Sequence, residues 1–197
     1  SGILERHAIL RKTADEITAR KDEIGRLLSR EEGKTLAEGI GETVRAAQIF
    51  DFFAGEVLRL AGEVLPSARP NIGVEVTREA VGVVGIITPW NFPIAIPAWK
   101  IAPALAYGNT VVFKPSEQTP LTALKMARLL ADILPEGVVN VILGRGDTVG
   151  NALINHPKIG MVSITGDIAT GKKVLQAAAK TVKRTHLELG GKAPVIV

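Results

Sequence analysis

Hydrophobic residues recur at helical spacing over the first third of the chain. Residues 3–31 carry a one-sided stripe of Ile, Leu and Ala among charged positions, which predicts a surface helix packed on a larger body. A second helical pattern runs over 35–61 and has Gly62 near its end, where glycine commonly terminates helices. The chain therefore begins with two predicted helices.

The pattern then changes from helical spacing to strand-like alternation. Pro66, Pro70 and Gly73 indicate a linker after the helices. Alternation of apolar and polar residues over 74–78, followed by an apolar run over 81–87, predicts a β-hairpin that leads into a strand.

Strand and helix patterns alternate over the rest of the chain. We expect strands at 83–87, 110–114, 138–143, 160–164, 184–188 and 193–197, and helices near 97–107, 121–134, 147–155 and 169–179. This alternation is typical of βαβ units and predicts an α/β fold with a parallel sheet covered by helices. Ligands of such sheets bind beyond the carboxyl ends of the strands, so the residues directly after each strand carry the most information.

Composition narrows the chemistry. The 197 residues are 46% hydrophobic but only 4% aromatic, as expected of an aliphatic core, and they include no cysteine. Within these residues this excludes a disulfide scaffold, a thiolate metal site and a cysteine nucleophile. The three histidines are too scattered for a metal site, so we expect none.

Charge and targeting signals argue against nucleic acid and membrane partners. The net charge is +4, and one cluster of cations has no interleaved aromatic residues, which favours a solvated helix face over nucleic-acid binding: Lys172, Lys173, Lys180, Lys183 and Arg184. The uncharged run between Glu79 and Lys100 contains three prolines, so we interpret it as buried core. The start, SGILERHAIL, lacks an initiator Met and a signal-peptide segment, and we expect a cytoplasmic protein whose ends are both cut.

A rigid turn, Thr88-Pro89-Trp90-Asn91-Phe92-Pro93, follows the strand at 83–87. Two prolines bracket it, and it presents an amide side chain that could stabilise an oxyanion. Alternatively, Asn91 caps the next helix.

Lys114-Pro115-Ser116-Glu117 follows the strand at 110–114 and brings a cation and a carboxylate to the sheet edge. Both groups can hydrogen-bond ribose hydroxyls, and the carboxylate would repel a 2′-phosphate. The alternative is a surface ion pair that opens a helix with Ser116 or Thr119 as its N-cap.

Two glycine-rich turns follow later strands. The segment 144–150 has the form GxGxxxG, which is not the dinucleotide fingerprint GxGxxG and is weak evidence alone. The segment 166–171 opens a helix, where free backbone amides could receive a phosphate. Asp167 competes with that use, because its carboxylate can cap the same amides.

The segment His186-Leu187-Glu188-Leu189-Gly190-Gly191 places a carboxylate between two leucines. Poor solvation would raise the pKa of Glu188 and suit it to general-base catalysis. The alternative is an exposed glutamate at a strand end.

Taken together and in this order, TPWNFP, KPSEQTP, ITGDIATGKK and LELGGKAP resemble the aldehyde dehydrogenase superfamily of NAD(P)-dependent enzymes. The resemblance covers essentially the whole chain. It implies a fragment of a protein more than twice as long, with the nucleophilic cysteine a few dozen residues beyond LELGG. The nearest patterns are those of semialdehyde, aminobutyraldehyde and betaine aldehyde dehydrogenases.

The resemblance also implies roles for individual residues. Asn91 would supply the oxyanion amide, Glu188 the general base, and Lys100 a charge relay. The cofactor, NAD or less readily NADP, would be bound by the residues at the strand ends: Thr88, Pro89, Trp90, Lys114, Pro115, Ser116, Glu117, Gly146, Gly150, Gly166, Asp167, Ile168, Ala169 and Leu189. Most members have a serine or another small residue where this chain has Asp167, which sets it apart at the phosphate contact.

The resulting domain prediction has three parts. Residues 1–71 form helices that pack on the cofactor domain, 72–87 form a hairpin of an oligomerisation region with an entry strand, and 88–197 form an incomplete Rossmann-like dinucleotide-binding domain. The expected partners are a small aldehyde and further copies in a homodimer or homotetramer. A non-catalytic binding or assembly module that keeps the fold is the alternative.

Overall fold

The fold is a parallel sheet between two layers of helices. It is taken from a computed structural model that describes residues 1–196. The helices are α1 (Ile3–Ala19), α2 (Lys21–Glu32), α3 (Leu36–Glu56), α4 (Ala95–Ala106), α5 (Pro120–Ala131), α6 (Asn151–Asn155) and α7 (Ile168–Ala179), with a short 3-10 turn at Val57–Arg59 and a π-helical turn at Gly146–Gly150. The strands are β1 (Glu63–Pro66), β2 (Gly73–Val76), β3 (Val83–Ile87), β4 (Thr110–Lys114), β5 (Val139–Val141), β6 (Ile159–Thr165) and β7 (Arg184–Glu188).

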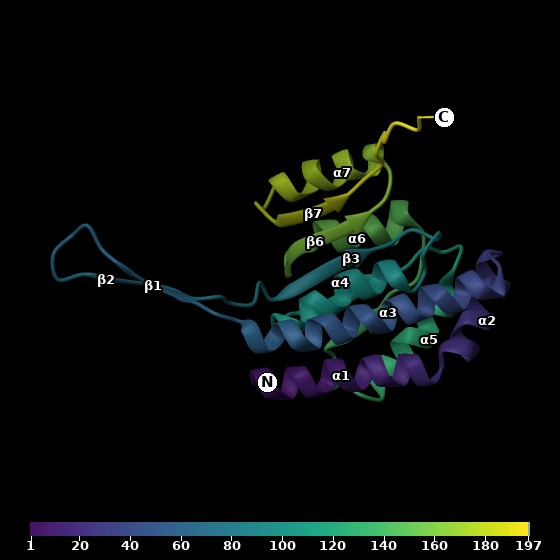
Figure 1. The fold of residues 1–197 in the computed structure, drawn as a ribbon. Coiled ribbons are helices and arrows are strands. Elements are labelled where there is room, and N and C mark those ends of the chain that lie inside the picture. The colour runs from purple at the N-terminus through teal and green to yellow at the C-terminus, as the bar shows by residue number, and fades with distance from the viewer. Residues whose placement is uncertain (197) are drawn as a thin grey trace.

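The five-stranded sheet has the order β5-β4-β3-β6-β7, and every neighbouring pair is parallel. The chain first builds outward from β3 through β4 to β5, and then returns to add β6 and β7 on the other side of β3 (Figure 1). The switch point of the topology therefore lies between β3 and β6, where open α/β sheets bind their ligands. All five strands end on the same side of the sheet, and we call this side the carboxyl edge.

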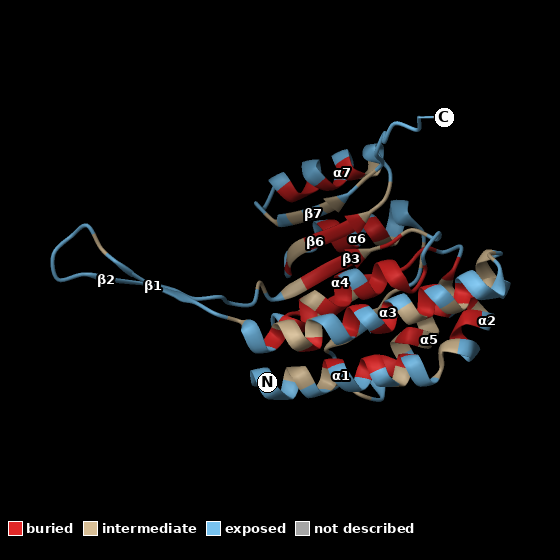
Figure 2. Cartoon of the chain, viewed as in Figure 1, coloured by how far each residue is buried: buried red, intermediate tan, exposed pale blue. Residues whose placement is uncertain are grey.

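Alternation along the central strands divides the core in two. Val84 and Ile86 of β3 pack with α1–α5, whereas Val83 and Ile87 face the smaller cluster formed with α6 and α7. Figure 2 shows the buried residues concentrated in the sheet and on the helix faces turned toward it. The expected α/β class with a parallel sheet and flanking helices is thus confirmed.

The first predicted helix is two helices. Arg20 interrupts the expected 3–31 segment with φ −107° and ψ 16°, separating α1 from α2. Ile17 and Ile24 are both fully buried on either side of the break. The interruption lets both helices pack against α3, which a single straight helix of that length would not do.

The hairpin predicted to lead into the strand at 83–87 is wrong in its pairing. Glu63–Pro66 pairs antiparallel with Gly73–Val76, so the expected linker contains the first strand and the turn of the hairpin. The expected strand at 83–87 is confirmed, and it joins the parallel sheet between β4 and β6. The physical reason is that Pro66 stands at the last position of β1, where a proline is tolerated in a two-stranded ribbon.

Two predicted strands also differ from the structure. The strand expected at 138–143 is limited to Val139–Val141, although the Ile142 amide still donates to the Phe113 carbonyl oxygen at 2.9 Å; the chain then turns through Gly144, whose φ is +146°. Residues 193–196 form no strand, and Val197 lies outside the described residues.

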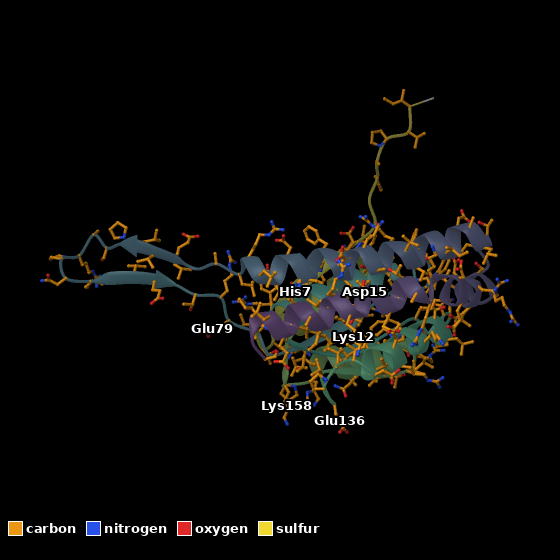
Figure 3. All side chains as sticks on the ribbon, turned by 60° about the horizontal axis from the view of Figure 1, so that its bottom comes forward. His7, Lys12, Asp15, Glu79, Glu136 and Lys158 are labelled. Carbon is orange, nitrogen blue, oxygen red and sulfur yellow. The ribbon has the colours of Figure 1, made fainter. Side chains whose placement is uncertain are left out.

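The hairpin projects from the body as an arm, which Figures 1 and 3 show from two directions. Every residue of β1 and β2 is exposed. His7, Lys12 and Asp15 lie along α1 on the main body, and Glu79 lies near the base of the arm (Figure 3). None of the helices within residues 1–196 combines the length and hydrophobicity needed to cross a membrane.

Helices α2 and α3 cross at a close contact between Gly25 and Gly39. We expect Gly39→Ala to destabilise the protein by about 1–3 kcal/mol, because the new Cβ would lie 2.5 Å from the Gly25 carbonyl oxygen and also against Ser29 Oγ. The matched control is Gly41→Ala in the same helix, where nothing lies within 4 Å; it should stabilise by about 0.5–1 kcal/mol. Urea unfolding of both variants tests this, and equal effects would contradict the close crossing.

Candidate functional site

The turn after β3 lies at the carboxyl edge beside the switch point. Its first residue, Thr88, is buried, and its amide donates to the Lys114 carbonyl oxygen at 3.3 Å. The hydroxyl Oγ1 of Thr88 is buried without a hydrogen-bond partner among the described residues. Trp90 and Asn91 are exposed. The turn thus offers a buried polar atom and two exposed side chains to a ligand.

Asn91 does not cap the helix that follows it. The N-terminus of α4 has no side-chain cap of its own. Instead, Glu42 Oε1 of α3 accepts hydrogen bonds from the amides of Ile94 at 3.0 Å and Ala95 at 3.1 Å. Because these amides already have an acceptor, the side chain of Asn91 is not needed as a cap.

Lys114 and Glu117 form the ion pair that the sequence suggested. Lys114 Nζ donates to Glu117 Oε2 at 3.0 Å and to the Pro115 carbonyl oxygen at 3.0 Å. The lysine side chain is 3% exposed and the glutamate 50% exposed, so the pair runs from the buried strand end to the surface. Hydrogen bonds from its own backbone amide and from Lys114 lower the pKa of Glu117, which keeps it ionised at neutral pH.

Neither Ser116 nor Thr119 caps α5 with its side chain. Ser116 Oγ accepts from the Gln118 amide at 3.2 Å in a local turn. The N-terminal amide of Thr122 donates to Glu31 Oε2 of α2 at 2.8 Å, and Leu121 donates to the other oxygen of the same carboxylate. The start of α5, like that of α4, is therefore capped by a glutamate from a distant helix.

The glycine-rich turn after β5 is closed by a surface ion pair. Arg145 Nη2 lies 3.0 Å from Asp147 Oδ2, and this hydrogen bond, with one from Thr148, lowers the pKa of Asp147 to about 2. Gly146 begins the π-helical turn and Gly150 ends it, the latter buried. Arg145 is close enough for its positive charge to contribute to the lowered pKa of Glu117.

Asp167 is the N-cap of α7. Its carboxylate accepts from the Thr170 amide at 2.9 Å and the Thr170 hydroxyl at 2.7 Å, and these bonds lower its pKa. The carboxylate thus occupies a donor that a phosphate would otherwise use. Ile168 and Ala169 in the first turn remain exposed. Leu189 packs so close to Gly171 that a Cβ there would lie 2.6 Å from it.

Glu188 is exposed at the end of β7, so the expectation that its flanking leucines would desolvate it is wrong. Leu187 packs into the cluster with α6 and α7, whereas Glu188 points to the opposite face because side chains alternate along a strand. Its backbone oxygen accepts from the Gly166 amide at 3.0 Å, which joins the ends of β6 and β7.

Lys100 lies on the buried face of α4, on the same side of the sheet as Glu188. Its Nζ donates to Ser163 Oγ of β6 at 3.1 Å, and that hydroxyl lies 3.0 Å from His186 Nδ1 of β7. Burial lowers the pKa of Lys100 to about 8, and the negative charge of Glu188 partly offsets the effect. Burial and the charge of Lys100 lower the pKa of His186, while Glu188 opposes this shift.

Lys100, Ser163 and His186 border a cavity of about 910 Å³ between α4 and the strands β6 and β7. The family resemblance points to Lys100, whereas no sequence motif gives a role to Ser163 or His186. Their contact follows from the parallel register, which pairs Ser163 with His186. No pattern within either segment reveals that register.

The predicted residues therefore fall into three groups along the carboxyl edge. One is the turn 88–91 at the end of β3, the second is the Lys114–Glu117 pair with the neighbouring glycine turn, and the third combines Glu188 with the start of α7. Lys100 approaches the third group from the buried face of α4.

Comparison with known proteins identifies the family and the fold. The family model described as the aldehyde dehydrogenase family matches residues 2–197. The chain belongs to the aldehyde dehydrogenase family. Family relatives include the mitochondrial succinate-semialdehyde dehydrogenase of Arabidopsis thaliana, 46% identical over 98% of this chain and 37% of its own length. Betaine aldehyde dehydrogenase of Bacillus subtilis is 45% identical over 98% of this chain and 40% of its own length.

Solved structures of the family superpose closely. Betaine aldehyde dehydrogenase of Staphylococcus aureus in complex with NAD+ has a TM-score of 0.94 at 40% identity, covering 97% of this chain and 39% of that one. An NADP-dependent enzyme of Escherichia coli has a TM-score of 0.96 at 39% identity, covering 98% and 40%. The chain thus spans about two fifths of the length of the relatives it matches.

The lowered pKa of Lys100 predicts a pH dependence of stability. The buried ammonium costs stability below pH 8, and this cost disappears as the pH rises from about 8 toward the unfolded value of 10.5. Between these values the unfolding free energy of the wild type, measured against Lys100→Met, should rise by about 1 kcal/mol per pH unit.

Urea unfolding at several pH values measures this difference. The same substitution at Lys12, an exposed lysine of α1, controls for titration of the remaining lysines. A wild-type-minus-variant difference that stays flat over the range would contradict the burial of a titrating Lys100.

Proposed function

We propose that this chain forms the cofactor-binding part of an enzyme that oxidises a small aldehyde to a carboxylic acid with NAD+. The observation that carries the proposal is that an exposed amide, Asn91, follows β3 beside the switch point, and an exposed carboxylate, Glu188, ends β7 on the same carboxyl edge. The family match supports assigning oxidation chemistry to this edge.

The residues along the edge fit a dinucleotide. The unpartnered hydroxyl of Thr88 and the ammonium of Lys114 supply hydrogen bonding next to the ionised carboxylate of Glu117. We assign Lys114, Pro115, Ser116 and Glu117 to the adenosine ribose, and Gly146, Gly150, Gly166, Ile168, Ala169 and Leu189 to the walls of the site. Thr88, Pro89 and Trp90 line its floor, and Asp167 limits the phosphate contact. When bound, the nicotinamide accepts the hydride that leaves the aldehyde carbon.

The acyl chemistry divides between two residues of this chain and a cysteine that lies outside its 197 residues. When the thiolate adds to the aldehyde, the Asn91 side-chain amide donates a hydrogen bond to the developing oxyanion. After the hydride has left, Glu188 takes a proton from water, which attacks the thioester and releases the acid and the thiolate. Solvent exposure of Glu188 suits this step because the base must reach water.

Lys100 is placed to support Glu188. Burial lowers the pKa of Lys100 to about 8 although the charge of Glu188 raises it, and this value allows Lys100 to lose or accept a proton near physiological pH. We assign it the relay of the proton that Glu188 removes from water.

Assembly, substrate and location form part of the same proposal. The arm exposes Val64, Leu65, Ile72, Val74 and Val76, an apolar surface that supports a homodimer or homotetramer.

Relatives named for succinate semialdehyde, α-ketoglutaric semialdehyde and betaine aldehyde support a small aldehyde as substrate. We place the reaction in the cytoplasm, whereas the plant relative is named mitochondrial.

The complete gene product tests this function through Glu188→Gln. With succinic semialdehyde or betaine aldehyde and NAD+, the variant should release one NADH per active site and then turn over at least about 100-fold more slowly, because general-base deacylation is lost. Stopped-flow absorbance at 340 nm measures both phases. Glu136→Gln, an exposed glutamate remote from the carboxyl edge, is the control. A wild-type protein that forms no NADH from any aldehyde would favour a non-catalytic module.

Cofactor choice gives a second test. We expect Glu117→Gln to reduce the preference for NAD+ over NADP+ by about three- to tenfold, because the half-exposed carboxylate repels a 2′-phosphate through partly screened charge. Titration of both cofactors by intrinsic fluorescence measures the ratio, again with Glu136→Gln as control. An unchanged ratio would remove Glu117 from the ribose site.

A further inference from the structure

Two charged side chains that precede the sheet in sequence reach the turn bearing Asn91. Lys34 lies between α2 and α3, and Glu42 lies in the second turn of α3. The Glu42 side chain is 2% exposed and that of Lys34 is 14% exposed, with 2.8 Å between Nζ and Oε2. We call this pair the Lys34–Glu42 clamp.

The lysine holds the turn by its backbone and by an aromatic ring. Lys34 Nζ donates to the Asn91 carbonyl oxygen at 3.0 Å and lies 4.3 Å from the centroid of the Phe92 ring. A second carboxylate oxygen, Glu32 Oε2, lies 3.6 Å away. The ammonium therefore joins the end of α2 and the side of α3 to the turn.

The glutamate holds the next two residues of the chain. Glu42 Oε1 accepts from the amides of Ile94 and Ala95, while its other oxygen receives Lys34. The buried carboxylate of Glu42 thus fixes where α4 begins. Its partner, Lys34, fixes the carbonyl group of Asn91, which lies three residues before Ile94. At the other end the turn is tied to β4 through the Thr88 amide.

We propose that the Lys34–Glu42 clamp positions the Asn91 side chain for oxyanion stabilisation. The inference rests on the proposed function, because it assigns Asn91 to the oxyanion. The Asn91 side chain is exposed, and its backbone, held at the carbonyl oxygen by Lys34, fixes the point from which the amide reaches a ligand. An oxyanion donor must stand within hydrogen-bond reach of an atom that becomes charged only in the transition state, and displacement of about 1 Å is costly.

A purely structural role predicts different behaviour. If the clamp only stabilised the fold, each correctly folded molecule would keep the wild-type kcat in every clamp variant. If it positions Asn91, kcat falls even where folding is restored. Stability and catalysis must therefore be separated.

The experiment uses the complete gene product carrying Lys34→Met, Glu42→Gln or both. Lys34→Met releases the Asn91 carbonyl and leaves the Glu42 carboxylate without its cation, so both stability and kcat should fall, kcat by about 10- to 100-fold. The double variant removes both charges of the pair and leaves only the Glu32 carboxylate, whose side chain is 11% exposed, without its neighbouring cation. Its unfolding midpoint should recover toward that of the wild type, while kcat per titrated active site stays low and NAD+ affinity changes less than twofold.

Lys34→Arg and Lys125→Met complete the set. Arginine keeps a cation that can donate to both partners, so Lys34→Arg should retain more of kcat than Lys34→Met. Lys125 pairs with Glu23 across α5 and α2, away from the turn, so the same substitution there should leave kcat unchanged. Recovery of kcat together with stability in the double variant would overturn the inference.

Hydrogen exchange separates failure of the inference from failure of the function. In Lys34→Met the amides of residues 90–92, 94 and 95 should exchange faster than in the wild type, whether or not the protein oxidises aldehydes. An active wild type with unchanged exchange in the variant would overturn the clamp alone. Faster exchange in a protein that makes no NADH from any aldehyde would instead overturn the oxyanion role along with the proposed function.

Discussion

The starts of the helices at the carboxyl edge impose the constraint on which the rest of the site depends. A helix that follows a parallel strand begins with amides that lack intrahelical acceptors, and these must be satisfied or left for a ligand. Glu42 accepts from two such amides of α4, Glu31 from two of α5, and Asp167 from one of α7. The first two carboxylates come from helices that are otherwise remote in sequence. The N-terminal helices thereby help to build the edge of the sheet as well as covering it.

Two buried lysines near this edge differ in the group that compensates their charge. Lys114 has a carboxylate partner at hydrogen-bond distance, so its charge belongs to an ion pair that reaches the surface. Lys100 donates to the hydroxyl of Ser163, and burial lowers its pKa to about 8. A neutral hydrogen-bond acceptor compensates desolvation less than a carboxylate does. The first arrangement suits a fixed binding contact, and the second suits proton movement.

The sequence predicted the parallel sheet because its strands are apolar runs separated by helical spacing, as in Val83–Ile87 and Thr110–Lys114. It could not predict pairing, which depends on contacts between distant segments. The hairpin was therefore misplaced, since the prolines at 66 and 70 are equally consistent with a linker and with a ribbon and its turn. The capping box of Thr35 and Glu38 was accessible from local spacing, whereas Glu42 lies 52 residues before the amide of Ile94 that it accepts from. For Glu188 the flanking leucines favour burial and the strand end favours exposure; the exposed alternative is the one found, because side chains alternate along β7.

The arm formed by β1 and β2 has an energetic consequence of its own. Its eight strand residues are all exposed, so it has main-chain hydrogen bonds but no apolar interior. Two-stranded ribbons of this kind are at best marginally stable in water. Neither cluster of the main core contains a residue of β1 or β2. In a single copy of the chain, opening the arm therefore costs far less free energy than unfolding the body, and it occurs independently of global unfolding. A protease that requires an extended, unpaired backbone would accordingly cut here first, leaving the sheet and its helices folded.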